Sequence, residues 1–120
     1  MASNITKLGD MAASERKVFL RRERLGAESR YLWAYLDDLG NLHIDGQDLG
    51  PATIPVSSDG EHEWFLTIHA TELPRLRELL GVSPDADLLD TLESQWSGPR
   101  SGELERALDE SGIPLDRFVV

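Results

Sequence analysis

The stretch 31–48, YLWAYLDDLGNLHIDGQD, constrains the fold more than any other part of the chain. Its first part, 31–36, is aromatic or aliphatic without interruption, which is typical of a strand that other elements cover. Gly40 and Asn41 both tolerate positive φ, so they predict a hairpin loop. Residues 42–45 then alternate between apolar and polar, as a return strand does. Because a two-stranded ribbon is marginally stable alone, we expect the remaining chain to pack against this hairpin.

Two further segments favour strands. Residues 53–56 lie beside prolines and predict a short edge strand, since proline is tolerated at the edge of a sheet. Residues 61–69, EHEWFLTIH, alternate strictly and predict a strand that pairs antiparallel in the same sheet. Trp64 and Phe65 fall on opposite faces of this strand, so we expect one of them in the core.

Leucines at helical spacing follow the strands. They predict three helices, at about 72–80, 84–96 and 102–111, with prolines near two of the starts and glycines after the ends. The tail 113–120 is either a last strand or an extended packing segment. Strands followed by helices predict an α+β fold, in which an antiparallel sheet of three to four strands carries helices on one face.

The first thirty residues differ from the rest in charge. Residues 1–30 hold seven Lys or Arg against four Asp or Glu, whereas residues 31–120 hold five basic against eighteen acidic side chains. We therefore predict a basic N-terminal arm, partly helical or disordered, ahead of a single acidic α+β domain at 31–120. Ser14 is a suitable cap for a helix over 15–25, and a strand over 17–22 is the alternative. The arm either contacts nucleic acid, docks on the acidic face of the chain itself, or is a flexible tail.

Composition restricts the function. The 120 residues include no cysteine, which excludes a disulfide framework and a thiolate metal site. No apolar run has the length of a signal peptide core or a membrane span, so we expect a cytoplasmic protein with no membrane contact. The net charge of −10 disfavours nucleic acid and favours either solubility alone or a basic protein partner.

The sequence contains no pattern that is specific to a catalytic or cofactor site. His43 and Asp45 share a strand face, but a zinc site needs three or four ligands. His62 and His69 are seven residues apart and point to opposite faces. The aspartates around the hairpin do not match a calcium loop, and the serines lie mainly in turns and helix caps. We therefore expect no catalytic residue, no metal ligand and no cofactor.

The remaining positive feature is an acidic surface near aromatic side chains, which resembles the way small acidic inhibitors meet basic enzymes: charge steers the encounter and an aromatic residue anchors it. The predicted partner-binding residues are Asp37, Asp38, Asp45, Asp48, Glu61, Glu63 and Trp64.

Three runs carry a resemblance to known proteins: YLWAYLDDLGNLHIDGQDLG, EHEWFLTIHATELPRLRELLG and a late SGIP. Over about 31–115 they resemble a group of small acidic α+β proteins of actinobacteria, a group with no assigned activity that therefore assigns no site residues. In size, charge and order of elements the chain is also similar to bacterial immunity proteins, which neutralise toxins. The first thirty residues lie outside this resemblance.

Three functions follow as hypotheses. The leading one is a non-enzymatic protein–protein interaction module, an immunity- or antitoxin-like inhibitor of a basic partner such as a nuclease. The alternative is a small-ligand-binding or regulatory domain with a pocket between sheet and helices, lined by Trp33, Trp64 and Trp96. The third is an enzyme that uses a carboxylate pair or His43, for which a carboxylate within hydrogen-bond distance of His43 in a cleft would be the sign.

Overall fold

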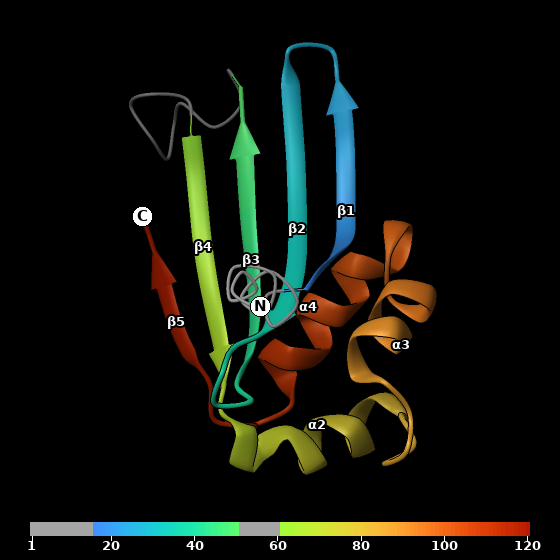
Figure 1. The fold of residues 1–120 in the computed structure, drawn as a ribbon. Helices are drawn as coiled ribbons and strands as arrows, with labels where there is room; N and C mark the ends of the chain where they lie inside the picture. Colours follow the sequence, from blue (N-terminus) through green and yellow to red (C-terminus); the bar gives the residue numbers. More distant parts are fainter. Residues whose placement is uncertain (1–15, 51–60) are drawn as a thin grey trace, which may run out of the picture.

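A computed structural model describes residues 16–50 and 61–120 of the chain. Its centre is an antiparallel sheet in which the strands follow one another in chain order, each hydrogen-bonded to the next (Figure 1). The strands are β1 (Lys17–Leu25), β2 (Glu28–Leu36), β3 (Leu42–Leu49), β4 (Glu61–Ile68) and β5 (Asp116–Val119).

The predicted hairpin is confirmed as β2 and β3, which pair from Ser29↔Leu49 to Leu36↔Leu42. Gly40, with a φ of 84°, occupies the left-handed region in the connecting loop. The Asp37 carboxylate holds this loop because it accepts hydrogen bonds from the backbone N–H groups of Leu39 and Asn41, both at 2.9 Å. The strand predicted over 61–69 is also confirmed, as β4.

The largest correction concerns the N-terminal arm. The helix expected over 15–25 is wrong for the described part, because residues 17–25 form strand β1 and pair with β2. The alternative, a strand over 17–22, is confirmed and extends to Leu25. The basic residues of this segment therefore belong to the sheet, which has five strands within residues 16–50 and 61–120 and not three to four. The edge strand expected over 53–56 lies outside the described residues.

A bulge interrupts β1 and explains why its pattern is hard to recognise. Phe19 pairs with Trp33 and Arg21 pairs with Leu32, so one residue of β1, Leu20, is extra. Leu20 and Arg21 consequently point to the same face of the sheet, and strict alternation fails at this place.

The helical layer begins after β4 with a short 3-10 turn at Ala70–Glu72 and α2 (Leu73–Leu80), followed by α3 (Leu88–Gln95), a second 3-10 turn at Gly98–Arg100 and α4 (Ser101–Glu110). The three predicted helices are confirmed, with one shorter than expected. Helix α3 begins at Leu88 and not near residue 84, because the Asp87 side chain caps it by accepting a hydrogen bond from the backbone N–H of Asp90. The tail forms β5, which pairs with β4.

The core lies between the helices and one face of the sheet, and Figure 1 shows the helices gathered beside that face. It consists mainly of leucines; on the sheet side its members are Val18, Leu20, Leu32, Ala34, Leu42, Ile44, Leu66 and Ile68. These positions alternate with residues of the opposite face, so the two faces have separate compositions.

A polar bridge joins α4 to the sheet at the edge of this core. The Arg21 guanidinium donates to the Ser101 hydroxyl at 3.0 Å and to the Glu105 carboxylate at 2.7 Å. The Trp64 indole N–H donates to the other oxygen of Glu105 at 3.2 Å. A residue of the predicted basic arm is thus a structural contact between sheet and helix.

Candidate functional site

The sheet face opposite the core is rich in aromatic side chains. In the described part of the chain no helix packs against this face, which we call the uncovered face. Of the eight aromatic side chains in the sequence, six project from it. They are Phe19, Tyr31, Trp33, Tyr35, Phe65 and Phe118.

Strand register places the central residues of this face in one row. Phe19 pairs with Trp33, Trp33 with Asp45, Asp45 with Phe65, and Phe65 with Phe118. Neighbouring rings are in contact, with centroids 6.2 Å apart for Phe19 and Trp33 and 6.0 Å apart for Phe65 and Phe118. A carboxylate therefore occupies the middle of an otherwise aromatic row.

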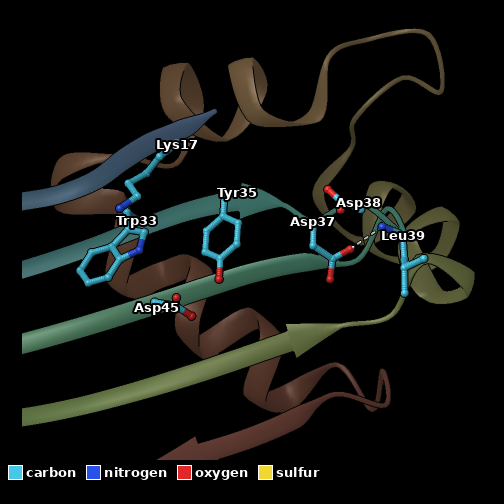
Figure 2. A pocket seen from close by; sticks show the side chains of 7 residues that line it. All are labelled: Lys17, Trp33, Tyr35, Asp37, Asp38, Leu39 and Asp45. Atoms are coloured by element: carbon cyan, nitrogen blue, oxygen red, sulfur yellow. Dashed lines mark hydrogen bonds between the residues drawn. The ribbon is translucent and has the colours of Figure 1, made fainter. Parts of the chain in front are cut away.

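A hollow of about 700 Å³ opens beside Asp45, between the uncovered face and the hairpin loop. Its lining residues are Lys17, Trp33, Tyr35, Asp37, Asp38, Leu39 and Asp45 (Figure 2). The Lys17 ammonium lies 5.1 Å from the centroid of the Trp33 ring, which is a cation–π contact. Leu39 is 80% exposed at the outer rim. The hollow thus combines two aromatic rings, three carboxylates, one exposed apolar side chain and one resident cation.

Asp45 is the most unusual residue of the hollow. It is only 5% exposed, and its Oδ1 has no hydrogen-bond partner among the described residues. Burial raises the pKa of Asp45 above its ordinary value, although the charges of His43 and Lys17 and a hydrogen bond from the Tyr35 side chain act in the opposite direction. A buried carboxylate without full hydrogen bonding costs stability, so this position is better suited to a ligand than to the fold.

A chain of hydrogen bonds runs beside the hollow. His43 Nε2 lies 2.8 Å from the Asp37 carboxylate, and His43 Nδ1 lies 3.3 Å from the Thr67 hydroxyl. The His43 ring also stacks on Tyr35 with centroids 4.7 Å apart. Hydrogen bonds from His43 and from the loop lower the pKa of Asp37 to about 2, so this carboxylate is ionised at neutral pH.

This arrangement meets the distance criterion that we set for an enzyme, but its geometry favours a structural role. Thr67 is the second-last residue of β4 and pairs in the ladder with His43 on one side and Asp116 on the other, so its backbone is held by both neighbouring strands. If Thr67 were a nucleophile activated by His43 in acyl transfer, the site would also need hydrogen-bond donors that point at the developing oxyanion. The Asp37 carboxylate already accepts hydrogen bonds from the loop backbone. We therefore interpret this series of hydrogen bonds as support for the position of Tyr35 and the hairpin.

The structure separates the predicted partner-binding residues into groups. Asp37, Asp38 and Asp45 meet at the hollow. Glu61 and Glu63 lie on the uncovered face too, but at the far end of β4, beyond the row of Phe65. These residues therefore do not form a single patch.

Asp48 and Trp64 point to the other face. Trp64 packs over Gly46, where an added Cβ would lie 2.2 Å from the indole ring, and it is part of the bridge to Glu105. Asp48 pairs with His62 in the ladder, and burial raises its pKa. Trp64 is consequently a packing residue in this structure and not an exposed anchor.

The alternative pocket is not formed as expected. Trp33 lies on the uncovered face, whereas Trp64 and Trp96 pack against the core on the opposite side of the sheet. The three tryptophans therefore cannot line one pocket between the sheet and the helices.

Other classes of site have no support in the part of the chain that is described. No three His, Asp or Glu residues among 16–50 and 61–120 are arranged to hold a metal ion. Within the same residues, no helix has the length and apolar character that crossing a bilayer requires.

Comparison with known proteins adds no relative from which a function could be transferred. No protein-family model, curated protein or solved structure matches the chain. The resemblance to immunity proteins therefore stays a prediction, and the site must be interpreted from its own chemistry.

Sequence reasoning missed most of the aromatic surface. The alternation of Tyr31, Trp33 and Tyr35 was visible, and so was the position of Phe65 on the face opposite Trp64. The missing information was which face the helices cover. Phe19 could have been found only by recognising β1 and its bulge.

Proposed function

We propose that this protein is a non-enzymatic interaction module that binds a basic protein on the uncovered sheet face, as an immunity- or antitoxin-like inhibitor of a toxin such as a nuclease. The observation that carries the proposal is the concentration of six of the eight aromatic side chains on one face, around an acidic hollow. Aromatic residues are enriched among the side chains that dominate binding energy at protein interfaces.

The charges on this face support a basic partner. Asp37, Asp38 and Asp45 surround the hollow, and the net charge of the whole chain is −10. Such a field raises the rate of encounter with a positively charged protein and repels an acidic one. Leu39 at the rim, 80% exposed, adds an apolar contact to the charged ones.

A single-stranded nucleic acid is the other ligand that an aromatic sheet face can bind, because bases stack on aromatic rings. Such sites combine the rings with a positively charged groove for the phosphates. Here the middle of the row is Asp45, and Glu61 and Glu63 lie farther along the same face. Lys17 and Arg22 lie on this face too, over Trp33 and Phe19, but the carboxylates outnumber them. The charge distribution therefore favours a protein partner.

The proposal can be tested by comparing variants of the two faces. The protein is immobilised and exposed to an extract, and retained proteins are eluted with a gradient of NaCl. We expect a basic protein to be retained by the native chain, to elute as salt screens the charges, and to be lost with Trp33→Ser or Phe65→Ser. Leu79→Ser is the matched control, because Leu79 is a 43% exposed apolar residue of helix α2.

The inhibitory part of the proposal needs a second measurement. The retained protein is purified and its nuclease activity is measured with increasing amounts of the native chain or of Trp33→Ser. We expect inhibition by the native chain only. Retention that does not depend on the NaCl concentration, or that persists in both uncovered-face variants, contradicts the proposal.

A further inference from the structure

The hollow contains a cation of the chain itself. The Lys17 ammonium lies over the Trp33 ring at 5.1 Å, and its charge acts on Asp45. Lys17 comes from the first residue of β1, and its side chain is exposed to solvent. The site therefore holds a positive group over a ring face and within the electrostatic influence of a carboxylate, and that group belongs to one exposed side chain.

The hydrogen bonding of Asp45 is incomplete with Lys17 in place. Asp45 is nine-tenths buried, lines the hollow, and has an Oδ1 without a partner among the described residues. Figure 2 shows its carboxylate on the same side of the sheet as Trp33 and Tyr35. This oxygen is itself buried, so a donor in the hollow reaches it when the Asp45 carboxylate turns, and it then satisfies a polar atom whose burial now costs stability.

Among cationic groups, a guanidinium fits these features better than an ammonium. It is planar and stacks on aromatic faces, and it presents several N–H donors that match a carboxylate. Trp33 and Tyr35 provide the rings, and Asp45 with Asp38 at the rim provides the acceptors. The exposed Leu39 can cover the methylene stem of an arginine, since long cationic side chains bury their stems on apolar surface.

We propose that the hollow is a binding pocket for an arginine side chain of the basic partner, and that Lys17 occupies it in the free protein and is displaced on binding. This inference rests on the proposed function, because it names the group by which that partner is anchored. The inference makes Lys17 a competitor of the partner's arginine. It therefore predicts that removing the charge of Lys17 improves binding.

The test uses N-acetylarginine amide as the probe and follows the amide and indole N–H signals by NMR. We expect saturable shifts centred on the Trp33 indole, with a dissociation constant in the range of about 1–10 mM for so small a ligand. The corresponding citrulline amide is the control ligand, because it has nearly the same shape without the charge. We expect it to cause no saturable shift.

Three variants separate the contributions. We expect Asp45→Asn to weaken binding of the arginine probe at least about fivefold, because the charge-assisted hydrogen bond is lost. Lys17→Gln should strengthen binding about threefold, because the resident cation no longer competes. Glu110→Gln removes one negative charge at the end of α4, away from the hollow, and should change the affinity little.

Several results would overturn the inference: no saturable shift at about 50 mM probe, equal shifts with the citrulline amide, unchanged binding in Asp45→Asn, or weaker binding in Lys17→Gln. The last variant keeps the test decisive even if Asp45→Asn fails to fold. If a basic protein is retained as described under the proposed function while the arginine probe fails, the interface stands and only the arginine pocket is wrong.

Discussion

Asp45 is a residue at which stability and binding are expected to oppose each other. Its position in the middle of an aromatic row gives its carboxylate little solvent and incomplete hydrogen bonding. A neutral or apolar residue would pack there at lower cost, because ionised groups are poorly stabilised away from water. If the carboxylate serves a partner, replacing it should stabilise the free chain and weaken the complex.

We therefore predict that Asp45→Asn raises the free energy of unfolding by about 1 kcal/mol at pH 7. The pKa of Asp45 is raised in the folded chain, so the ionised form is penalised above that pKa. As pH falls through the folded pKa towards the ordinary value of 3.8, the native chain takes up the proton and recovers this stability. The advantage of the variant should thus be largest at neutral pH and disappear below 3.8.

Urea unfolding at several pH values measures this effect, with Glu110→Gln as the control for the loss of one charge. A variant less stable than the native chain at pH 7 would mean that the carboxylate supports the fold.

Asp37 should show the opposite dependence on pH. Its pKa is lowered from 3.8 to about 2, chiefly by the hydrogen bond with His43, so its contribution to stability is complete above 3.8 and is lost as pH falls towards 2. We predict that Asp37→Ala lowers the unfolding free energy by about 1 kcal/mol at pH 7, because the loop loses its hydrogen bonds.

The same variant should flatten the decline in stability between pH 4 and pH 2, measured by circular dichroism. Asp38→Ala is the neighbouring control, since Asp38 is exposed and holds none of the loop hydrogen bonds that Asp37 accepts. Equal acid sensitivity of the native chain and Asp37→Ala would contradict the assignment.

At the scale of elements, the strands with regular alternation and the helices with caps and leucine spacing could be predicted. Strand β1 could be predicted only as an alternative to a helix, because its bulge and its density of arginines imitate an exposed helix. Strand β5 has four exposed residues, too few to distinguish a strand from an extended tail. The shorter α3 follows from the choice of Asp87 as its cap, where the sequence offered Ser83 and Pro84 as an earlier start.

The bridge between β1 and α4 gives a prediction at this scale. Arg21→Met should lower the unfolding free energy by about 2 kcal/mol, because it leaves the Glu105 carboxylate and the Ser101 hydroxyl without their common donor. Arg24→Met, an exposed position on the same strand, should change it by less than about 0.5 kcal/mol. Urea unfolding of both variants checks this, and equal effects would show that Arg21 has no special contact.

The contact between β3 and β4 at Gly46 gives a second prediction at the scale of elements. A Cβ at this position would lie 2.2 Å from the Trp64 ring, so Gly46→Ala should cost about 2 kcal/mol. The double variant with Trp64→Leu should recover part of the loss, as measured by a double-mutant cycle. Gly102→Ala in α4, where nothing lies within 4 Å, should be neutral or stabilising. A tolerated Gly46→Ala would contradict the close packing.

For the whole molecule, the α+β class, with its sheet and its helical layer, could be predicted from the order of strand and helix patterns along the sequence. The location of the site could not. The seven predicted contact residues were chosen by charge and proximity in sequence. The sheet distributes them over both faces, because Asp48 and Trp64 alternate with Gln47 and Phe65. Only the position of the helices decides which set is exposed, and periodicity carries no information on that choice.

The net charge of −10 also acts at this scale. Many carboxylates repel one another, and this repulsion destabilises the folded chain at low ionic strength. We predict that raising NaCl from about 10 to 200 mM increases the melting temperature by a few degrees, because the screening length falls below typical separations. Differential scanning calorimetry measures this, and a decrease would show that ion pairs such as Arg16–Asp87 outweigh the repulsion.

The bulge in β1 has a consequence for how this chain can change in length. Because Leu20 is the extra residue, deleting it would restore strict alternation along the strand and leave the pairing of Phe19 with Trp33 next to that of Arg21 with Leu32. The apolar filling that Leu20 gives to the core would be lost, while Arg21 kept its contact with α4. An insertion between Leu20 and Arg21 would instead reverse the faces of the residues that follow it in β1. Arg22 would then point to the leucines of the core, and Arg21 would lose its contact with α4. Shortening and lengthening at neighbouring positions of one strand are thus far from equivalent.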